Sequence, residues 1–256
     1  MNLRTMTSLG LGVAGLASVI LIWHLVTVAG LVSKAFLSSP AATLDALLGG
    51  LRQGELVGQL TATVLRMLQG WLFASIAAVV LGSLIGISET ARAYLRPTLA
   101  FVRSLPASAV IPIAISLVGL GPGMVLGVIM FGSIWPTLLA TVQGFATVEP
   151  RLRDVARALH LSRRQYIAKI GLPNAIPDIL AGMRLSLTVA LILAVIGEML
   201  SGQEGLGSAI LLAARAFRAA DLYAGIVLLG LVGLISSYGL LLLELRATRW
   251  RHAGMR

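Results

Sequence analysis

Long apolar stretches alternate with short polar segments along most of the chain. Six stretches are long enough to be membrane spans, at about 9–32, 68–88, 99–120, 123–143, 176–200 and 222–245. A helix needs roughly 20 apolar residues to cross about 30 Å of hydrocarbon, and in lipid it satisfies its own backbone hydrogen bonds. The pattern therefore predicts an all-α, polytopic membrane protein with about six transmembrane helices.

The remaining apolar segments complete the predicted architecture. Stretch 9–32 is longer than the core of a signal peptide and follows one basic residue, Arg4, so we expect a retained anchor helix. Segments 40–50 and 205–219 are too short or too charged to span. Their apolar residues still recur at helical spacing, which predicts helices on the membrane surface or capping the bundle. Residues 1–256 are predicted to form a single transmembrane domain, with its core at about 55–245.

Composition supports a membrane protein and excludes several other classes. The chain is 57% hydrophobic and 12% charged, whereas a soluble domain carries about 25% charged residues. It contains no cysteine, which excludes disulfides and thiolate metal sites. The net charge of +10 fits basic loops on the cytoplasmic side of a membrane better than nucleic-acid binding.

The basic residues predict an orientation. Most of the 20 lysines and arginines fall in the two tails and in two alternate loops: Arg4, Arg92, Arg96, Arg103, Arg151, Arg153, Arg157, Arg163, Arg164, Lys169, Arg246, Arg249, Arg251 and Arg256. The opposite side carries fewer: Lys34, Arg52, Arg66, Arg215 and Arg218. This bias predicts a multi-pass protein with both termini in the cytoplasm.

The loop between the fourth and fifth spans, residues 148–178, is long, basic and patterned. Four apolar residues follow helical spacing opposite arginines: Leu152, Val155, Ala156 and Leu159. Pro150 suits a helix start, Ser162 suits the N-cap of a second helix, and Leu172, Pro173 and Pro177 are expected to end it. The prediction is two short helices bent near His160. Such a loop could bind anionic lipid headgroups, but a bent hairpin flanked by prolines favours docking another protein.

This loop resembles the EAA loop of bacterial binding-protein-dependent ABC importer permeases. The matching positions are Asp154, Val155, Ala156, His160, Ile170, Leu172 and Pro173. Spacing matches throughout, and the clearest departure is His160, where the family has a glycine. A glycine there would serve a turn with positive φ, and histidine enters that region more readily than most residues but at some cost.

The resemblance runs from about Ser39 to Arg251 and is nearest to the sulfonate, taurine and nitrate permeases. The stretches that support it are LSSPAATLDALL, FVRSLPASAVIPIAISLVGLGPG, GEMLSGQEGLGSAI and DLYAGIVLLGLVG. It implies the fold of a type I importer permease in the bacterial inner membrane. It also implies a homodimer, two ATP-binding subunits docked on a coupling loop at about 148–174, and a periplasmic or lipid-anchored substrate-binding protein.

The residues that the resemblance assigns to ATPase coupling are Arg153, Asp154, Ala156, Arg157, Leu159, His160, Leu161, Ser162, Leu172 and Pro173. Among them, Ala156 and Leu159 are expected to fill an apolar groove, while Arg153 and Arg157 meet acidic groups of the ATPase.

The chain itself is not predicted to be an enzyme. A Walker A loop needs a lysine before Ser or Thr, but Lys34 precedes Ala35 and Lys169 precedes Ile170. We therefore expect no cofactor in this chain, and ATP and Mg to be used by the partner ATPase. Its three histidines, His24, His160 and His252, have no metal-ligand spacing, so no metal site is predicted.

Four residues are candidates for the translocation path or its gates: Arg103, Pro106, Pro112 and Glu198. Arg103 could hold an anion, or snorkel to the cytoplasmic interface. The prolines could bend a pore-lining helix or form a plain kink, and Glu198 could act at an outer gate or be an interfacial, hydrated carboxylate. Arg184 is expected to reach toward the cytoplasmic headgroups.

Rival functions have less support in the sequence. A secondary transporter driven by an ion gradient usually carries ionisable residues near the middle of its spans, and these spans have almost none. A membrane enzyme would need converging catalytic groups. The substrate class stays open: a small anion such as a sulfonate, taurine or nitrate is favoured, and thiamine-precursor or riboflavin-like compounds are alternatives.

Overall fold

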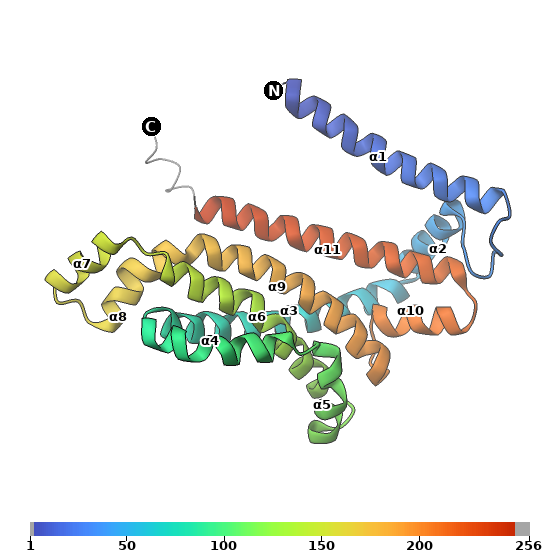
Figure 1. Cartoon of the computed structure of the whole chain (residues 1–256). Coiled ribbons are helices and arrows are strands. Elements are labelled where there is room, and N and C mark those ends of the chain that lie inside the picture. The colour runs from blue at the N-terminus through green and yellow to red at the C-terminus, as the bar shows by residue number, and fades with distance from the viewer. Residues whose placement is uncertain (1–2, 249–256) are drawn as a thin grey trace.

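The computed structural model describes residues 3–248, in which every regular element is helical (Figure 1). The elements are α1 Leu3–Val28, α2 Pro40–Gln53, α3 Glu55–Gly86, α4 Glu89–Ser104, α5 Ile111–Val118, α6 Pro122–Ala146, α7 Pro150–Ala158, α8 Arg163–Tyr166, α9 Leu172–Ser201, α10 Leu206–Arg215 and α11 Ala219–Ala247. The all-α prediction is confirmed. Arg249, Arg251, His252 and Arg256, on which part of the charge argument rests, lie outside the described residues.

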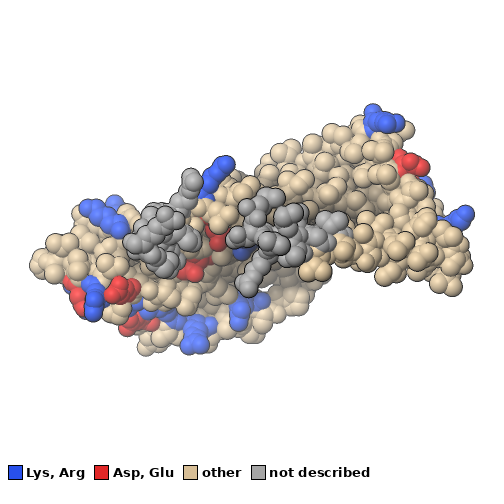
Figure 2. Space-filling view, turned by 90° about the horizontal axis from the view of Figure 1, so that it is seen from above, with Lys and Arg blue, Asp and Glu red and all other residues tan. Residues whose placement is uncertain are grey.

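The long helices are suited to crossing a membrane. Four segments are long and apolar enough: α3, α6, Arg163–Ser201 and α11. A fifth span results if the bent pair α4 and α5 counts as one. The predicted anchor falls on α1, whose described apolar part, Ala14–Val28, is shorter, so six spans stay a prediction. Figure 2 shows charged side chains over one half of the molecule and again at the opposite end, with a stretch of other residues between them on this face.

The third predicted span, 99–120, is wrong as a single helix. Helix α4 starts ten residues earlier, at Glu89, and a bend of 82° separates it from the 3₁₀ turn Ala107–Val110 and α5. The break occurs at Leu105, whose backbone is extended (φ −69°, ψ 124°), because Pro106 disfavours helical geometry in the residue before it. Arg103 therefore lies about 21 Å along α4 from its start, and not at the beginning of a span.

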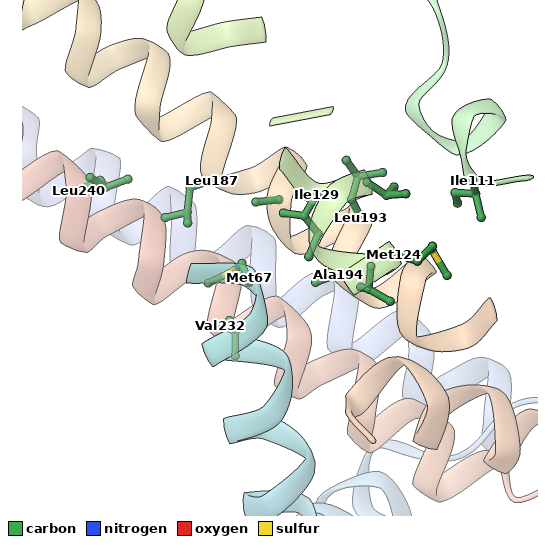
Figure 3. Packing of buried hydrophobic residues seen from close by; sticks show 12 residues of the cluster. Met67, Ile111, Met124, Ile129, Leu187, Leu193, Ala194, Val232 and Leu240 are labelled. Carbon is green, nitrogen blue, oxygen red and sulfur yellow. The ribbon is translucent and has the colours of Figure 1, made fainter. Parts of the chain in front are cut away.

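Helices α3, α6 and α9 form the centre of the bundle, and among these three α11 packs mainly against α9. Their buried residues make one core, in which Met67, Ile129, Leu193 and Val232 come from four different helices (Figure 3). Small residues allow the close approach. A Cβ added at Gly82 of α3 would lie 2.6 Å from the Thr141 Cβ of α6. The GxxxG spacing of Gly82 and Gly86 thus serves packing within the chain.

Two short helices cap one end of the bundle, as predicted for segments 40–50 and 205–219. Helices α2 and α10 pack with α11 at the end opposite α7 and α8 (Figure 1). Leu47, Leu206 and Leu228 form their buried cluster. Below, this is called the cap end, and the end with α7 and α8 the hairpin end. Helix α1 leans away from α11 (Figure 1) and is tied by a hydrogen bond of 2.8 Å from the Trp23 indole to the Ser38 carbonyl.

Candidate functional site

The predicted hairpin at the hairpin end consists of α7, a turn at residues 159–162, and α8 (Figure 1). The start at Pro150 is confirmed. The predicted end at Leu172, Pro173 and Pro177 is wrong, because α8 continues through a π-helical turn, Ile167–Gly171, directly into α9. In that turn the Leu172 N–H donates to the Ile167 carbonyl, five residues back. The wider turn absorbs Pro173, which has no N–H for α-helical pairing.

The turn of the hairpin needs a left-handed residue, and His160 supplies it with φ 47°. The His160 N–H donates to the Arg157 carbonyl and the Leu161 N–H donates to the Ala156 carbonyl, both at 3.0 Å. These two bonds form a Schellman motif, whose left-handed position is usually glycine. The predicted N-cap is also confirmed, since Ser162 and Gln165 form a capping box that starts α8.

Arg153 and Ala156 face the helical bundle and hold the hairpin against it. The Arg153 guanidinium donates to the Glu89 carboxylate at 3.1 Å and to the Ala146 carbonyl at 2.6 Å. Ala156 is buried, with 7% of its surface exposed. The expectation that these two residues reach outward to a partner is therefore corrected: Arg153 is engaged within the chain, and Ala156 is covered by it.

The outward face of α7 is apolar. Leu152, Val155 and Leu159 are 41%, 49% and 65% exposed, and their spacing of three and four residues puts them on one side of the helix. Beside them Arg157 pairs with Asp154 at 3.4 Å, and both side chains are largely exposed. A short helix thus presents an apolar stripe edged by charge, while Leu161, Leu172 and Pro173 are half-buried at its base.

A cleft of about 640 Å³ opens behind the hairpin, between α7, α8 and the junction of α3 with α4. Its lining residues are Leu84, Gly86, Ile87, Ser88, Glu89, Arg92, Phe145, Arg153, Ala156, Arg157, Leu161, Arg163 and Tyr166. The cleft combines four guanidinium groups with a single carboxylate, that of Glu89.

The candidates for the translocation path separate into two places. Arg103, Pro106 and Pro112 lie around the bend between α4 and α5, and all three are exposed. The Arg103 side chain forms no ion pair or hydrogen bond with another described residue. Glu198 lies at the cap end of α9 and does not contact them.

Glu198 is buried, in contrast to the hydrated interfacial carboxylate considered from the sequence. Its side chain has no exposed surface and forms an ion pair with Arg66 of α3. The Thr63 hydroxyl and the Gly207 N–H each donate to its carboxylate at 2.9 Å. The Leu206 N–H donates to the Thr63 hydroxyl at 2.8 Å. This network, called the Glu198 cluster below, joins α3, α9 and the start of α10.

Sequence reasoning missed the partners of these charged groups. Arg184 pairs with Glu244 near the C-terminal end of α11 at 3.3 Å, so its side chain reaches toward the hairpin end, and its expected approach to the cytoplasmic headgroups stays a prediction. Glu89 holds Arg153 from 64 residues away, and Arg66 holds Glu198 from 132 residues away. No local pattern could reveal these pairs, because salt bridges between distant segments leave no periodic signal.

An all-α bundle of long apolar helices with a projecting, basic hairpin defines a polytopic membrane permease. A family model described as "Binding-protein-dependent transport system inner membrane component" matches residues 74–249. The chain belongs to this family and is an ABC importer permease.

Similar proteins include transport permeases for small anions. A protein of Bacillus subtilis (strain 168), whose name assigns it to aliphatic sulfonates transport as the permease SsuC, is 31% identical over 93% of this chain and 86% of its own length. The nitrate import permease protein NrtB of Leptolyngbya laminosa is 33% identical over 73% of this chain and 66% of its own length. The bicarbonate transport system permease protein CmpB of Synechococcus elongatus is 29% identical over 88% of this chain.

A solved structure has the same fold. A chain of the MetNI methionine ABC transporter in inward-facing conformations superposes with a TM-score of 0.66, covering 77% of this chain and 98% of its own. Its 18% sequence identity shows the fold alone. The predicted fold class, that of an ABC importer permease, is thereby confirmed.

Proposed function

We propose that this chain forms the translocation path for a small anion and couples it to ATP hydrolysis by a separate subunit. The observation that carries the proposal is the exposed apolar stripe of Leu152, Val155 and Leu159 on a hairpin rooted in the bundle. An exposed apolar patch rimmed by charge marks a protein interaction site. In an ABC importer permease, the partner that we assign to this projecting hairpin is the ATPase.

The hairpin is built to transmit movement. Helix α8 continues through the π turn into α9, giving one 39-residue helical segment, Arg163–Ser201. A push on the hairpin therefore acts directly on a helix of the central bundle. Closure of two ATPase subunits on ATP would draw two such hairpins together and switch the spans between inward-open and outward-open states.

The proposed assembly contains two copies of this chain, two ATP-binding subunits that use ATP and Mg, and a periplasmic or lipid-anchored substrate-binding protein. It lies in the bacterial inner membrane with both termini in the cytoplasm. The positive-inside distribution of arginines supports this orientation, because it puts the hairpin on the side where ATP is available.

A small anion is the favoured substrate class. The similar permeases are named for sulfonates, nitrate and bicarbonate, all of which are anions. Arg103 supports the same class in this chain: it lies deep along α4, is exposed, and has no partner among the described residues. A charge at membrane depth faces water or a counter-charge, and a path for anions would supply both.

The docking claim is tested by co-purifying the ATPase encoded with this chain. Val155→Asp and Leu159→Asp each put a charge into the proposed contact and are expected to weaken ATPase binding roughly 30-fold, corresponding to about 2 kcal/mol. Thr90→Asp adds the same charge to exposed surface at the hairpin end and should leave binding unchanged. Ala156→Glu would be a poor test, because Ala156 is buried and its substitution disrupts the hairpin itself. An intact complex with a chain carrying both Val155→Asp and Leu159→Asp would refute the docking surface.

A further inference from the structure

The lining of the cleft behind the hairpin has two chemically different parts. One part is basic and consists of the guanidinium groups of Arg92, Arg153, Arg157 and Arg163. The other part, called the floor below, is apolar and consists of Leu84, Ile87 and Phe145. A cavity of about 640 Å³ is large enough for a headgroup together with part of a chain.

The charges in the cleft do not balance. Glu89 is its only lining carboxylate, and it already accepts from Arg153 at 3.1 Å and lies 3.8 Å from Arg92. The Arg163 guanidinium forms no ion pair or hydrogen bond with another described residue. Arg157 pairs with Asp154, which lies outside the cleft, through Nη1 alone. Arg163 and the remaining nitrogens of Arg157 are therefore available to an anion, and their planar donor geometry suits phosphate.

The position of the floor indicates where the anion comes from. Leu84 and Ile87 lie at the end of α3, and Phe145 lies at the end of α6. Both helices are long and apolar enough to cross a membrane, so their ends mark the boundary between hydrocarbon and headgroups. The arginines of α7 and α8 lie beyond that boundary. A free phosphate would contact the basic part of the cleft alone, whereas a phospholipid would contact both the basic part and the apolar floor.

We propose that this cleft binds an anionic phospholipid, with its phosphate held by Arg157 and Arg163 and the start of its acyl chain against Leu84 and Ile87. The site is separate from the apolar stripe of Leu152, Val155 and Leu159 that faces away on α7. A lipid held there would tie the hairpin to the membrane at the point where α3 turns into α4. Arg157, which the resemblance assigns to the ATPase contact, would be shared by the two sites, so the test below uses the chain without the ATPase.

The test uses the full purified chain in a neutral detergent and counts bound lipid by native mass spectrometry. Dioctanoyl phosphatidylglycerol is the probe, with dioctanoyl phosphatidylcholine and inorganic phosphate in parallel. We expect one saturable phosphatidylglycerol per chain, and a roughly 30-fold weaker affinity when Arg157→Gln and Arg163→Gln are combined, since each guanidinium near the surface contributes about fivefold. The matched control combines Arg96→Gln and Arg164→Gln, two exposed arginines of the same end that do not line the cleft, and should bind normally.

Three results would overturn the proposal. Equal weakening in both double variants would mean that the lipid responds to net charge and not to the cleft. Equal binding of inorganic phosphate would mean a free-anion site, and equal binding of phosphatidylcholine would mean that the guanidinium groups do not select the headgroup. As a positional check, phosphatidylglycerol with a photoreactive acyl chain should label the segment around Leu84 and Ile87 in the native chain, and labelling confined to other helices would also count against the site.

Discussion

The Glu198 cluster should be the most sensitive polar site of the bundle. Glu198→Gln keeps the size of the side chain and removes its charge. Arg66, whose side chain is only 15% exposed, would then have no counter-ion, and the Thr63 hydroxyl and Gly207 N–H would face a weaker acceptor. Because these groups come from three helices, the substitution should loosen α10 from α3 and α9.

The burial of the Arg66–Glu198 ion pair determines how much stability Glu198→Gln should lose. Breaking a buried ion pair by removing one partner costs about 3–5 kcal/mol, since a buried charge is left uncompensated. Gln retains part of the hydrogen bonding, so we expect the low end, about 3 kcal/mol. For a chain of this length each kcal/mol lowers the melting temperature by roughly 2–4 °C. The expected shift is therefore about 6–12 °C downward.

Intrinsic tryptophan fluorescence of the purified chain in detergent measures this shift, at one scan rate for all variants because unfolding of such a chain is irreversible. Arg218→Gln is the matched control: it breaks the ion pair with Asp221, 3.4 Å apart at the same end, whose side chains are 62% and 46% exposed. An exposed pair contributes less than about 1 kcal/mol, so this variant should melt close to the unchanged chain.

A double variant separates the burial of charge from the need for a carboxylate. Arg66→Met combined with Glu198→Gln removes the uncompensated charge while the amide oxygen still accepts from Thr63 and Gly207, and it should recover most of the lost stability. If Glu198→Gln melts no lower than Arg218→Gln, the ion pair does not hold the cap end. If the double variant melts as low as the single one, the loss is not due to an uncompensated charge.

Two further predictions concern the hairpin and the translocation path. His160→Gly removes a side chain from a left-handed position, where non-glycine residues are disfavoured by about 1 kcal/mol, so trypsin should cleave the hairpin about fivefold more slowly. Ala158→Gly, inside α7, should speed cleavage, and faster cleavage of His160→Gly would contradict the turn. Arg103→Gln in the reconstituted importer should lower nitrate or ethanesulfonate uptake at least tenfold through loss of a charge-assisted contact. Arg103→Lys keeps the charge and should retain uptake. Co-purification of the ATPase should be unchanged in both Arg103 variants. Normal uptake by Arg103→Gln would show that Arg103 is not part of the translocation path.

Much of the architecture was predictable because its signals are local. The length of each apolar stretch is enough to predict a helix in lipid, since any other backbone would leave hydrogen bonds unmade. The hairpin was also predictable in its start, turn and N-cap, because Pro150, His160 and Ser162 each act on their own backbone. The continuation of α8 into α9 was not, because a proline usually ends a helix and only the π turn before Pro173 lets this one continue.

The position of Arg103 along its helix was predicted wrongly because the start of that helix was predicted wrongly. Hydropathy put the beginning of the third span near residue 99, because residues 89–98 are polar. The fold extends α4 back to Glu89, where Ser88 caps the helix and Glu89 accepts from Arg153 of the hairpin. That ion pair joins residues 64 positions apart, which no local pattern describes.

Direction and pairing were decided by the tertiary structure alone. In a soluble protein an apolar residue points inward, but in a membrane both lipid and core are apolar, so hydropathy identifies a span without saying which side is buried. The same limit applies to α7, where spacing grouped Ala156 with Leu152 and Leu159 although only Ala156 is buried. The sequence determined the helices, their caps and the family. Which side of each helix is covered, and which arginine meets which carboxylate, became known only when segments far apart in the chain were packed together.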